Sequence, residues 1–416
     1  MGYCGLDFGT SNTTFGIGTE NAPALVRLES GQTTVPSAVF FHADGAGMAF
    51  GRDAIALFAQ GGEGRLMRSL KSVLGTELIE QETLVGRRRL AFRDVIKRFL
   101  AEIKARGEAA AGRPLDSVVH GRPVHFVDNG TDADRQAEAV LAEIAREVGF
   151  RHVSFQLEPV AAALDYERQV DSEEIALVAD IGGGTSDFSI IRLDPARQTA
   201  ADRSADILAN AGIRVGGTDF DQFLSLASAM PALGYGSPML KPGLVAPNGY
   251  FTDLSTWAKI NFLYTPKVLT ELRALRRESA RPDLLDRLIR VAEEHQGHQL
   301  AASVEGAKIA LGETAATTIR LDGIERGLEI AVTPDQFHAA TILLVERVRQ
   351  SIRRCLADSG VGAGGIDTVF LTGGSTLLPH LRAAILAEVP EARVIEGDKF
   401  GSVGLGLTIE AMRRYG

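Results

Sequence analysis

The sequence predicts an α/β protein built from two similar lobes. Predicted strands and helices alternate along most of its 416 residues, and one pattern occurs twice. Residues 5–17 (GLDFGTSNTTFGI) and 178–191 (VADIGGGTSDFSII) share an order of apolar strand, aspartate, glycine loop with small hydroxyl residues, and second strand. Asp7 and Asp180 are separated by a little under half the chain, so the repeat indicates two lobes rather than a series of short units.

The first half of the chain opens with short strands and continues with helices. Apolar runs separated by Gly, Asn and Pro predict a meander of four strands within residues 1–42. Apolar residues at helical spacing then predict the helices. We expect helices over 52–60, 92–110, 131–150 and 160–169, and strands within 116–126 and 152–159.

The second half begins again with strands in the same order. It ends with a long helix, a strand that leads into a glycine loop, and two more helices. We expect strands over 175–180, 188–194, 205–215 and 367–374, and helices over 334–360, 377–389 and 402–415.

The segment 222–304 differs from the rest of the second half. It has a Gly- and Pro-rich stretch and then helical patterns around Trp257, the single tryptophan of the chain. Its apolar residues allow two interpretations, a docking surface for a protein partner or a small local core, and the local core is favoured. These residues are Tyr250, Phe251, Leu254, Trp257, Phe262 and Tyr264.

Composition and charge exclude several classes of protein. The formal net charge is −9, from 44 basic and 53 acidic residues, which argues against a nucleic-acid surface. No apolar stretch reaches the roughly 18–20 residues of a membrane span, and no secretion signal is visible. Two cysteines, Cys4 and Cys355, are typical of a reducing compartment. We therefore expect a cytoplasmic protein without a membrane or nucleic-acid partner.

Four carboxylates follow or end the predicted strands: Asp7, Glu158, Asp180 and Asp187. Buried together as bare charges they would cost several kcal/mol each, a cost that a divalent cation relieves. Mg²⁺ usually keeps several waters and uses few protein carboxylates. The carboxylates therefore predict a hydrated Mg²⁺ site.

Three glycine loops accompany these carboxylates, at 9–12, 182–185 and 373–375. Glycine removes the Cβ that would keep a phosphate away from the backbone N–H groups. A single loop of this kind is usually only a turn, but two matched loops and a third in order are a stronger signal. Together they predict the two sides of a phosphate site and a third contact, for the nucleoside or the α-phosphate.

The loops LDFGTSN, ADIGGGTSDFS and LTGGST resemble the two phosphate loops and the adenosine loop of the actin-like ATPase superfamily. Within it, LEPVAAALDY, RVGGTDFDQFL and VEGAKIAL resemble segments of the DnaK-type (heat shock 70) chaperones. The segment 222–304 looks like that of a short bacterial YegD-like subgroup. The resemblance covers residues 3–412 apart from 222–304. It implies two lobes, each on an RNase H-like mixed sheet, with ATP in the cleft between them.

The resemblance also implies the lobe bounds. Residues 1–170 would form lobe I, and 171–416 would form lobe II with 222–304 as an enlarged insertion. Because the sequence ends on the predicted last helix, we expect no peptide-binding domain of the family's usual kind.

The resemblance implies a role for each matched residue around the phosphates. Asp7 and Asp180 would position Mg²⁺ through its waters, and Lys71 would contact the γ-phosphate and the attacking water. Glu158 and its partner Asp187 would orient that water. Without the resemblance, Lys71 would be interpreted as a solvated lysine of a helix. The phosphates of ATP or ADP would be held by Gly9, Thr10, Ser11 and Asn12 on one lobe and Gly182, Gly183, Gly184 and Thr185 on the other.

Further matches concern the switch and the nucleoside. Pro123 falls on the family's switch proline, which couples nucleotide state to lobe closure. The remaining nucleotide contacts are implied for Gly216, Gly217, Glu305, Lys308, Gly373, Gly374 and Ser375.

The base pocket departs from the family's pattern. Ile309, Gly312 and Leu377 stand where the family has Arg, Ser and Arg, and the two arginines sandwich the adenine. The cation–π attraction of about 0.5–2 kcal/mol per Arg is then absent. We expect weaker nucleotide binding, or less discrimination among bases, than in a standard member.

Four functions remain open from the sequence. The first is an ATP-hydrolysing switch that acts on a protein partner. The second is a small-molecule kinase of the same superfamily, with a general-base aspartate and no reason for Lys71. The others are an actin-like filament protein and a nucleotide sensor with negligible turnover. The combination of Lys71 and Glu158 favours the switch.

Overall fold

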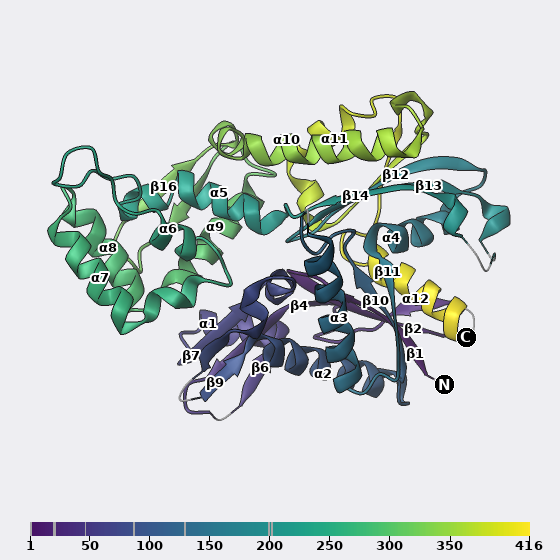
Figure 1. Cartoon of the computed structure of the whole chain (residues 1–416), viewed down its shortest axis with the longest axis horizontal. Helices are drawn as coiled ribbons and strands as arrows, with labels where there is room; N and C mark the ends of the chain where they lie inside the picture. The colour runs from purple at the N-terminus through teal and green to yellow at the C-terminus, as the bar shows by residue number, and fades with distance from the viewer. Residues whose placement is uncertain are drawn as a thin grey trace. The chain divides into compact units, whose positions relative to one another are not determined.

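The structure is a computed structural model that describes residues 2–19, 22–45, 47–85, 88–128, 130–198, 200 and 203–416 (Figure 1). The chain divides into two compact units. Unit 1 comprises Met1–Gly217, Glu346–Leu377 and Leu381–Gly416, and unit 2 comprises Thr218–Val345 and Leu378–His380. The lobe boundary expected after residue 170 stays a prediction.

A mixed sheet forms around the first strand of the chain. β1 (Tyr3–Phe8) pairs antiparallel with β2 (Asn12–Gly18) and parallel with β10 (Ser117–Arg122). The strand order is β11-β10-β1-β2-β3, and β4 also pairs with β2. The remaining strands are β3 (Pro23–Leu25), β4 (Thr34–Pro36) and β11 (His152–Leu157).

A second mixed sheet repeats this arrangement around β12 (Glu174–Ile181). β12 pairs antiparallel with β13 (Ser186–Leu193) and parallel with β17 (Thr368–Thr372), as β1 does with β2 and β10. The order β14-β13-β12-β17-β18 matches β3-β2-β1-β10-β11. The outer strands are β14 (Ile207–Ile213) and β18 (Arg393–Glu396). The α/β fold predicted from the repeated motif is thus confirmed.

Two helices join the cores of these sheets (Figure 1). α12 (Ser402–Tyr415) packs on β1, β2 and β10, whereas α4 (Glu158–Tyr166) packs on β12 and β13. The helices approach closely, because a Cβ on Gly406 would lie 1.7 Å from the carbonyl oxygen of Ala161. One buried cluster includes Val119 of β10, Ala176 of β12, Ile191 of β13, Phe370 of β17, Val160 of α4 and Leu407 of α12.

The opposite face of the first sheet carries α2 (Phe92–Ala111). Side chains alternate along a strand, so Phe15 and Gly16 of β2 face opposite sides of the sheet. A Cβ on Gly16 would meet Thr408 of α12, whereas the Phe15 ring contacts Gly107 of α2. α3 (Thr131–Glu147) packs beside α2.

The fourth strand expected in the meander leaves the first sheet. β5 (Ala38–His42) pairs with β6 (Met48–Phe50) and β7 (Gly64–Arg68) instead. Its side chains Ala38 and Phe40 form a separate small core with α1. The associated elements are α1 (Gly51–Ala59) and the hairpin β8 (Glu82–Val85) and β9 (Arg88–Ala91).

Unit 2 contains the segment 222–304. Phe251 and Leu254 are fully buried and Trp257 is 5% exposed, which supports the local-core interpretation for these side chains. The exposed apolar side chains of the segment are Leu240, Leu244 and Val245 instead. The elements here are α5 (Gly217–Ala227), α6 (Gly249–Leu254), α7 (Pro266–Arg277), α8 (Pro282–Glu293), α9 (Gly297–Ala310), and the hairpin β15 (Thr317–Arg320) and β16 (Glu329–Val332).

Two further helices contribute residues to both units: α10 (Pro334–Ser359) and α11 (Pro379–Leu386). Among the described residues, none of the helices combines the length and the apolar character that crossing a membrane requires.

A buried histidine lies in the first sheet. His120 of β10 is fully buried beside the ring of Phe155, and its Nδ1 lies 2.9 Å from the carbonyl oxygen of Gly121. Its Nε2 has no hydrogen-bond partner within the described part of the chain. Burial lowers the pKa of His120 to about 4, and the positive charge of Lys71 acts in the same direction.

This histidine predicts acid sensitivity of the fold. Between pH 6.5 and 4 the unfolded chain binds a proton at His120 that the folded chain does not. The free energy of unfolding therefore decreases as the pH is lowered through this range. We expect the unfolding free energy to lose about 2 kcal/mol more between pH 7 and 4.5 in the natural chain than in His120→Leu. Denaturant titrations at both pH values measure this difference, with the exposed His152→Leu as control. Parallel losses in the natural chain and His120→Leu would contradict the assignment.

Candidate functional site

Carboxylates come together where the equivalent strands β1 and β12 end. Asp7 is the second-last residue of β1, and Asp180 is the second-last residue of β12. Asp180 and Asp187 are direct cross-strand partners on β12 and β13. Asp180 is 8% and Asp187 1% exposed. The repeated motif therefore places its acids at equivalent points of the two sheets.

Lys71 is buried among these acids. It lies in a short 3₁₀ turn, η1 (Leu70–Val73), and forms an ion pair with Glu158, the first residue of α4. The Lys71 and Glu158 side chains are only 6% and 9% exposed. The alternative of a solvated helix lysine is therefore wrong for Lys71. Glu158 at the start of a helix is also stabilised by the helix dipole.

Burial and neighbouring carboxylates raise the pKa values of the three aspartates. Burial and the charge of Glu158 raise the pKa of both Asp7 and Asp187 to about 7, although Lys71 opposes the shift. The pKa of Asp180 is raised well above its ordinary value by burial and by the charges of Glu158, Asp187 and Asp7. Burial acts to lower the pKa of Lys71, but the surrounding carboxylates outweigh it and raise that pKa. Lys71 therefore stays charged at neutral pH.

This donor set fits a hydrated divalent cation. Four carboxyl groups face one ammonium group, and Oδ2 of Asp187 is buried without a hydrogen-bond partner in the described part of the chain. No group of three or more His, Cys, Asp or Glu side chains within the described ranges could hold a metal ion directly. Because Mg²⁺ commonly keeps its waters, Asp7 and Asp180 suit contact through water.

The two glycine loops predicted to hold phosphates pack against each other. A Cβ on Gly183 would lie 2.2 Å from Oγ of Ser11, and one on Gly184 would lie 2.6 Å from Oγ1 of Thr10. The side chains of Thr10 and Ser11 in the first loop thus fill the space that side chains at positions 183 and 184 of the second loop would need. The two copies of the motif therefore lie next to each other within unit 1.

Further predicted residues support the second loop. Gly216 packs on it so closely that a Cβ there would lie 2.4 Å from the backbone nitrogen of Gly184. The carbonyl oxygen of Gly182 accepts hydrogen bonds from the nitrogen of Gly217 (3.0 Å) and from Oγ of Ser375 (2.9 Å). The third loop is therefore attached directly to the second.

The third loop depends on glycine at its first position. Gly373 has φ +81°, and a Cβ there would lie 2.3 Å from the carbonyl oxygen of Ile181 at the end of β12. Oγ1 of Thr376 donates to the carbonyl oxygen of Gly373 at 2.7 Å. Gly374 then opens the 3₁₀ turn η9 (Gly374–Leu377).

Two contacts around the site were not foreseen from the sequence. Ser37 holds the first loop, because its Oγ donates to the carbonyl oxygen of Gly9 (2.7 Å) and its nitrogen donates to that of Ser11 (2.9 Å). The nitrogen of Val124, which follows Pro123, donates to Oδ1 of Asp187 at 2.6 Å. No short sequence motif could have indicated either contact, because the partners lie far apart in the sequence.

Two of the nucleotide contacts implied by the resemblance, Glu305 and Lys308, lie in unit 2. Glu305 and Lys308 are both on α9, and Nζ of Lys308 lies 2.9 Å from Oδ1 of Asp221 on α5. Asp221, which sequence reasoning did not single out, therefore holds the lysine. Ile309 is 64% exposed, and Leu377 in unit 1 is 50% exposed.

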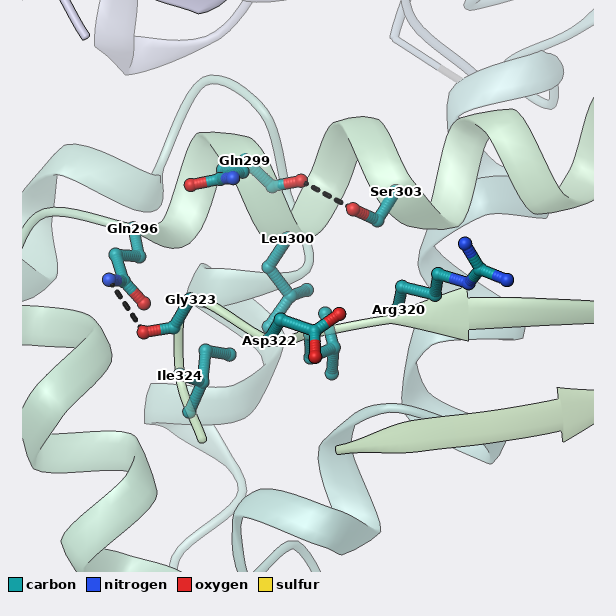
Figure 2. Close-up of a pocket in the computed structure, with 9 residues that line it drawn as sticks. Gln296, Gln299, Leu300, Ser303, Arg320, Asp322, Gly323 and Ile324 are labelled. Carbon is teal, nitrogen blue, oxygen red and sulfur yellow. Dashed lines mark hydrogen bonds between the residues drawn. The ribbon is translucent and has the colours of Figure 1, made fainter. Parts of the chain in front are cut away.

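A cavity of about 210 Å³ in unit 2 contains none of the predicted site residues (Figure 2). Figure 2 shows α9 on one side and the turn after β15 on the other, joined by the hydrogen bond from Nε2 of Gln296 to the carbonyl oxygen of Gly323 (2.9 Å). Arg320 and Asp322 line it with exposed side chains. The lining also includes apolar Leu300, Leu321 and Ile324, so the cavity has mixed character.

Two matching mixed sheets, each with a glycine loop after its first strand, define the actin-like ATPase class of folds. The family model of the Hsp70 protein matches residues 3–227 and 287–401. Because this match covers well over half of the chain, the chain belongs to the Hsp70 family.

Membership confirms the predicted Hsp70-type nucleotide-binding domain and supports ATP binding and a chaperone-like function. Members of the family generally bind ATP or ADP with Mg²⁺. The unmatched residues 228–286 fall inside the segment 222–304. The nearer likeness to the YegD-like subgroup stays a prediction.

The packing of Gly216 generates a test of the joined loops. In Gly216→Ala the new methyl group meets the backbone of Gly183 and Gly184, which no side-chain rotation can avoid. We expect the unfolding free energy to fall by about 1–3 kcal/mol and the affinity for inorganic tripolyphosphate to fall with it. Denaturant titration and calorimetry measure the two effects.

Gly249→Ala is the matched control, because nothing lies within 4 Å of a Cβ there. Its unfolding free energy should change by less than about 0.5 kcal/mol. If Gly216→Ala were as mild as Gly249→Ala, the described packing of the loops would be incorrect.

Proposed function

We propose that the chain is an ATP-driven conformational switch. It binds ATP with Mg²⁺, hydrolyses it slowly to ADP and phosphate, and passes the change in nucleotide state to a protein partner. The observation that carries this proposal is the buried ion pair of Lys71 and Glu158 within the acid cluster, beside two glycine loops that pack together.

The loops supply the phosphate contacts. Backbone N–H groups and hydroxyls of Gly9, Thr10, Ser11 and Asn12 hold the β- and γ-phosphates from one side, and those of 182–185 hold them from the other. Asp7 and Asp180 hold Mg²⁺ through its waters, and the bound ion neutralises phosphate charge. Gly216, Gly217 and the loop 373–375 keep the second phosphate loop in place and lead to the nucleoside.

Lys71, Glu158 and Asp187 carry the chemistry. Lys71 remains charged, so its ammonium group can donate to the γ-phosphate and stabilise charge that develops during transfer. Glu158 and Asp187 accept hydrogen bonds from the attacking water and orient it. The protein's contribution is positioning and charge stabilisation, as in other phosphoryl transfers.

Asp187 also connects the site to the segment after β10. Its Oδ1 accepts the hydrogen bond from Val124, next to Pro123. A change in the water or phosphate near Asp187 therefore acts on this backbone directly, which gives Pro123 a physical route for the switch role. Arg122, on the other side of Pro123, is fixed to Asp134 of α3 at 2.8 Å.

Among the alternatives, a kinase gives no role to a buried, charged Lys71. An actin-like filament protein stays an alternative. The cytoplasmic location and a partner that docks on 222–304 stay predictions. Phe251 and Trp257 of that segment are buried and would not contact such a partner, whereas Tyr250, Phe262 and Tyr264 are half-buried.

Removing the ammonium group tests the proposed chemistry. We expect Lys71→Met to release phosphate from MgATP at least about 100-fold more slowly than the natural chain, as when a transition-state donor is lost. ATP binding should persist, because the loops are intact. Single-turnover phosphate release and calorimetric ATP binding measure the two properties separately, with folding checked by circular dichroism.

Lys97→Met is the matched control. Lys97 also pairs with a glutamate, Glu147 at 2.7 Å, but both side chains are about 40% exposed. It should release phosphate at the natural rate. Equal rates in Lys71→Met and Lys97→Met would contradict the catalytic role, and firm ATP binding without release by the natural chain would indicate a sensor.

A further inference from the structure

Phe400 is an exposed aromatic side chain next to the third glycine loop. It lies in the turn between β18 and α12, and its side chain is 44% exposed. The other well-exposed large apolar side chains of the described residues are leucines, isoleucines and a valine. Leaving an aromatic ring in water forgoes the stabilisation that burial would give it, so its exposure calls for an explanation.

The turn that carries Phe400 is fixed by Asp398. Oδ1 of Asp398 accepts a hydrogen bond from the nitrogen of Phe400 at 3.2 Å. The carbonyl oxygen of Asp398 accepts hydrogen bonds from the nitrogens of Gly401 and Ser402, both at 3.2 Å. Thr372, the last residue of β17, also donates to that oxygen at 3.5 Å. The backbone that carries Phe400 is therefore attached to the second sheet.

The ring rests against the glycine loop itself. A Cβ on Gly374 would lie 3.0 Å from Cε1 and 3.2 Å from Cζ of Phe400, so the missing side chain of Gly374 provides room for the ring. The next residue, Ser375, donates to Gly182 of the second phosphate loop. A continuous set of contacts thus connects Phe400 to the phosphate site within unit 1.

We propose that Phe400 is a specificity-determining residue that stacks on the purine base of the bound nucleotide. This inference rests on the proposed function, since the base belongs to the nucleotide whose phosphates the two loops hold. Leu377, the last residue of η9, cannot provide the attraction of a charged side chain to the base. Phe400 provides an aromatic face instead, and the bound base covers the exposed ring.

Stacking of this kind determines how the site selects its ligand. Every base has a π-face, and a phenyl ring has no hydrogen-bonding group with which to distinguish one purine from another. The chain therefore binds ATP and GTP with similar affinity, within about threefold. Base recognition adds affinity here but little selectivity.

Calorimetry with three probes tests the assignment: MgATP, MgGTP and inorganic tripolyphosphate, which has no base. Phe400→Ala should weaken ATP and GTP binding by about 5- to 150-fold, the range of base–aromatic stacking. Tripolyphosphate affinity should not change, because the phosphate loops are intact. The control Leu343→Ala removes an equally isolated apolar side chain, 70% exposed on α10, and should leave all three affinities unchanged.

Phe400→Trp keeps the aromatic face and reports on stacking. It should retain natural ATP affinity, and ATP should quench its added fluorescence while tripolyphosphate should not. The natural chain, with Trp257 as its single tryptophan, gives the background signal.

Two results would overturn the proposal: unchanged ATP affinity in Phe400→Ala, or an equal loss of ATP and tripolyphosphate affinity, which would make Phe400 a support of the loop only. A marked preference of the natural chain for ATP over GTP would also count against it. Failure of the proposed function looks different, because the natural chain would then bind neither ATP nor tripolyphosphate.

Discussion

The close crossing of α4 and α12 is the constraint on which the site depends. Gly406 lets α12 touch the backbone of Ala161, and the two helices connect the cores of the two sheets. Glu158 is the first residue of α4, so the same crossing places this acid beside Lys71. A side chain at 406 would push the helices apart by more than packed cores tolerate. The separation of the acids on β1 and β12 thus depends on the packing of α4, which directly precedes β12, against α12, which lies far from both strands in the sequence.

The acid cluster is an arrangement that folding alone does not favour. Buried carboxylates raise one another's pKa, and a single lysine cannot neutralise four of them. Sites that store such unfavourable electrostatics are commonly functional, because an ion or a phosphate completes them. The loops around the cluster are well supported by Ser37, Gly216 and Ser375, so the polypeptide positions the charges rigidly. Well-supported loops and closely spaced, mutually repelling carboxylates fit a site that is preorganised for phosphoryl transfer.

The sequence was sufficient for the parts of the fold that are repeated or local. The repeat around Asp7 and Asp180 predicted two equivalent sheets, and the long periodic patterns predicted α2, α3, α10 and α12. The sequence was insufficient where contacts between distant residues determine strand pairing and burial. β5 pairs with β6 and β7 in another sheet rather than with β1 to β4. The burial of Lys71 depends on its ion pair with Glu158, which lies 87 residues further along the chain. The hydrogen bond from Val124 to Asp187 and the contact of Phe400 with Gly374 depend on tertiary structure in the same way. The family resemblance supplied the role of Lys71, whereas its physical setting came from the structure.

In the proposed function, the two glycine loops and the acid cluster form one site for the phosphates and metal of a nucleotide. A crystal structure of the chain with a nonhydrolysable ATP analogue and Mn²⁺ is the decisive test, because Mn²⁺ can be located by its anomalous scattering. We expect phosphates between Thr10–Asn12 and Gly182–Thr185, with waters of the metal hydrogen-bonded to Asp7 and Asp180. A nucleotide bound away from these loops, or a metal remote from both aspartates, would contradict it.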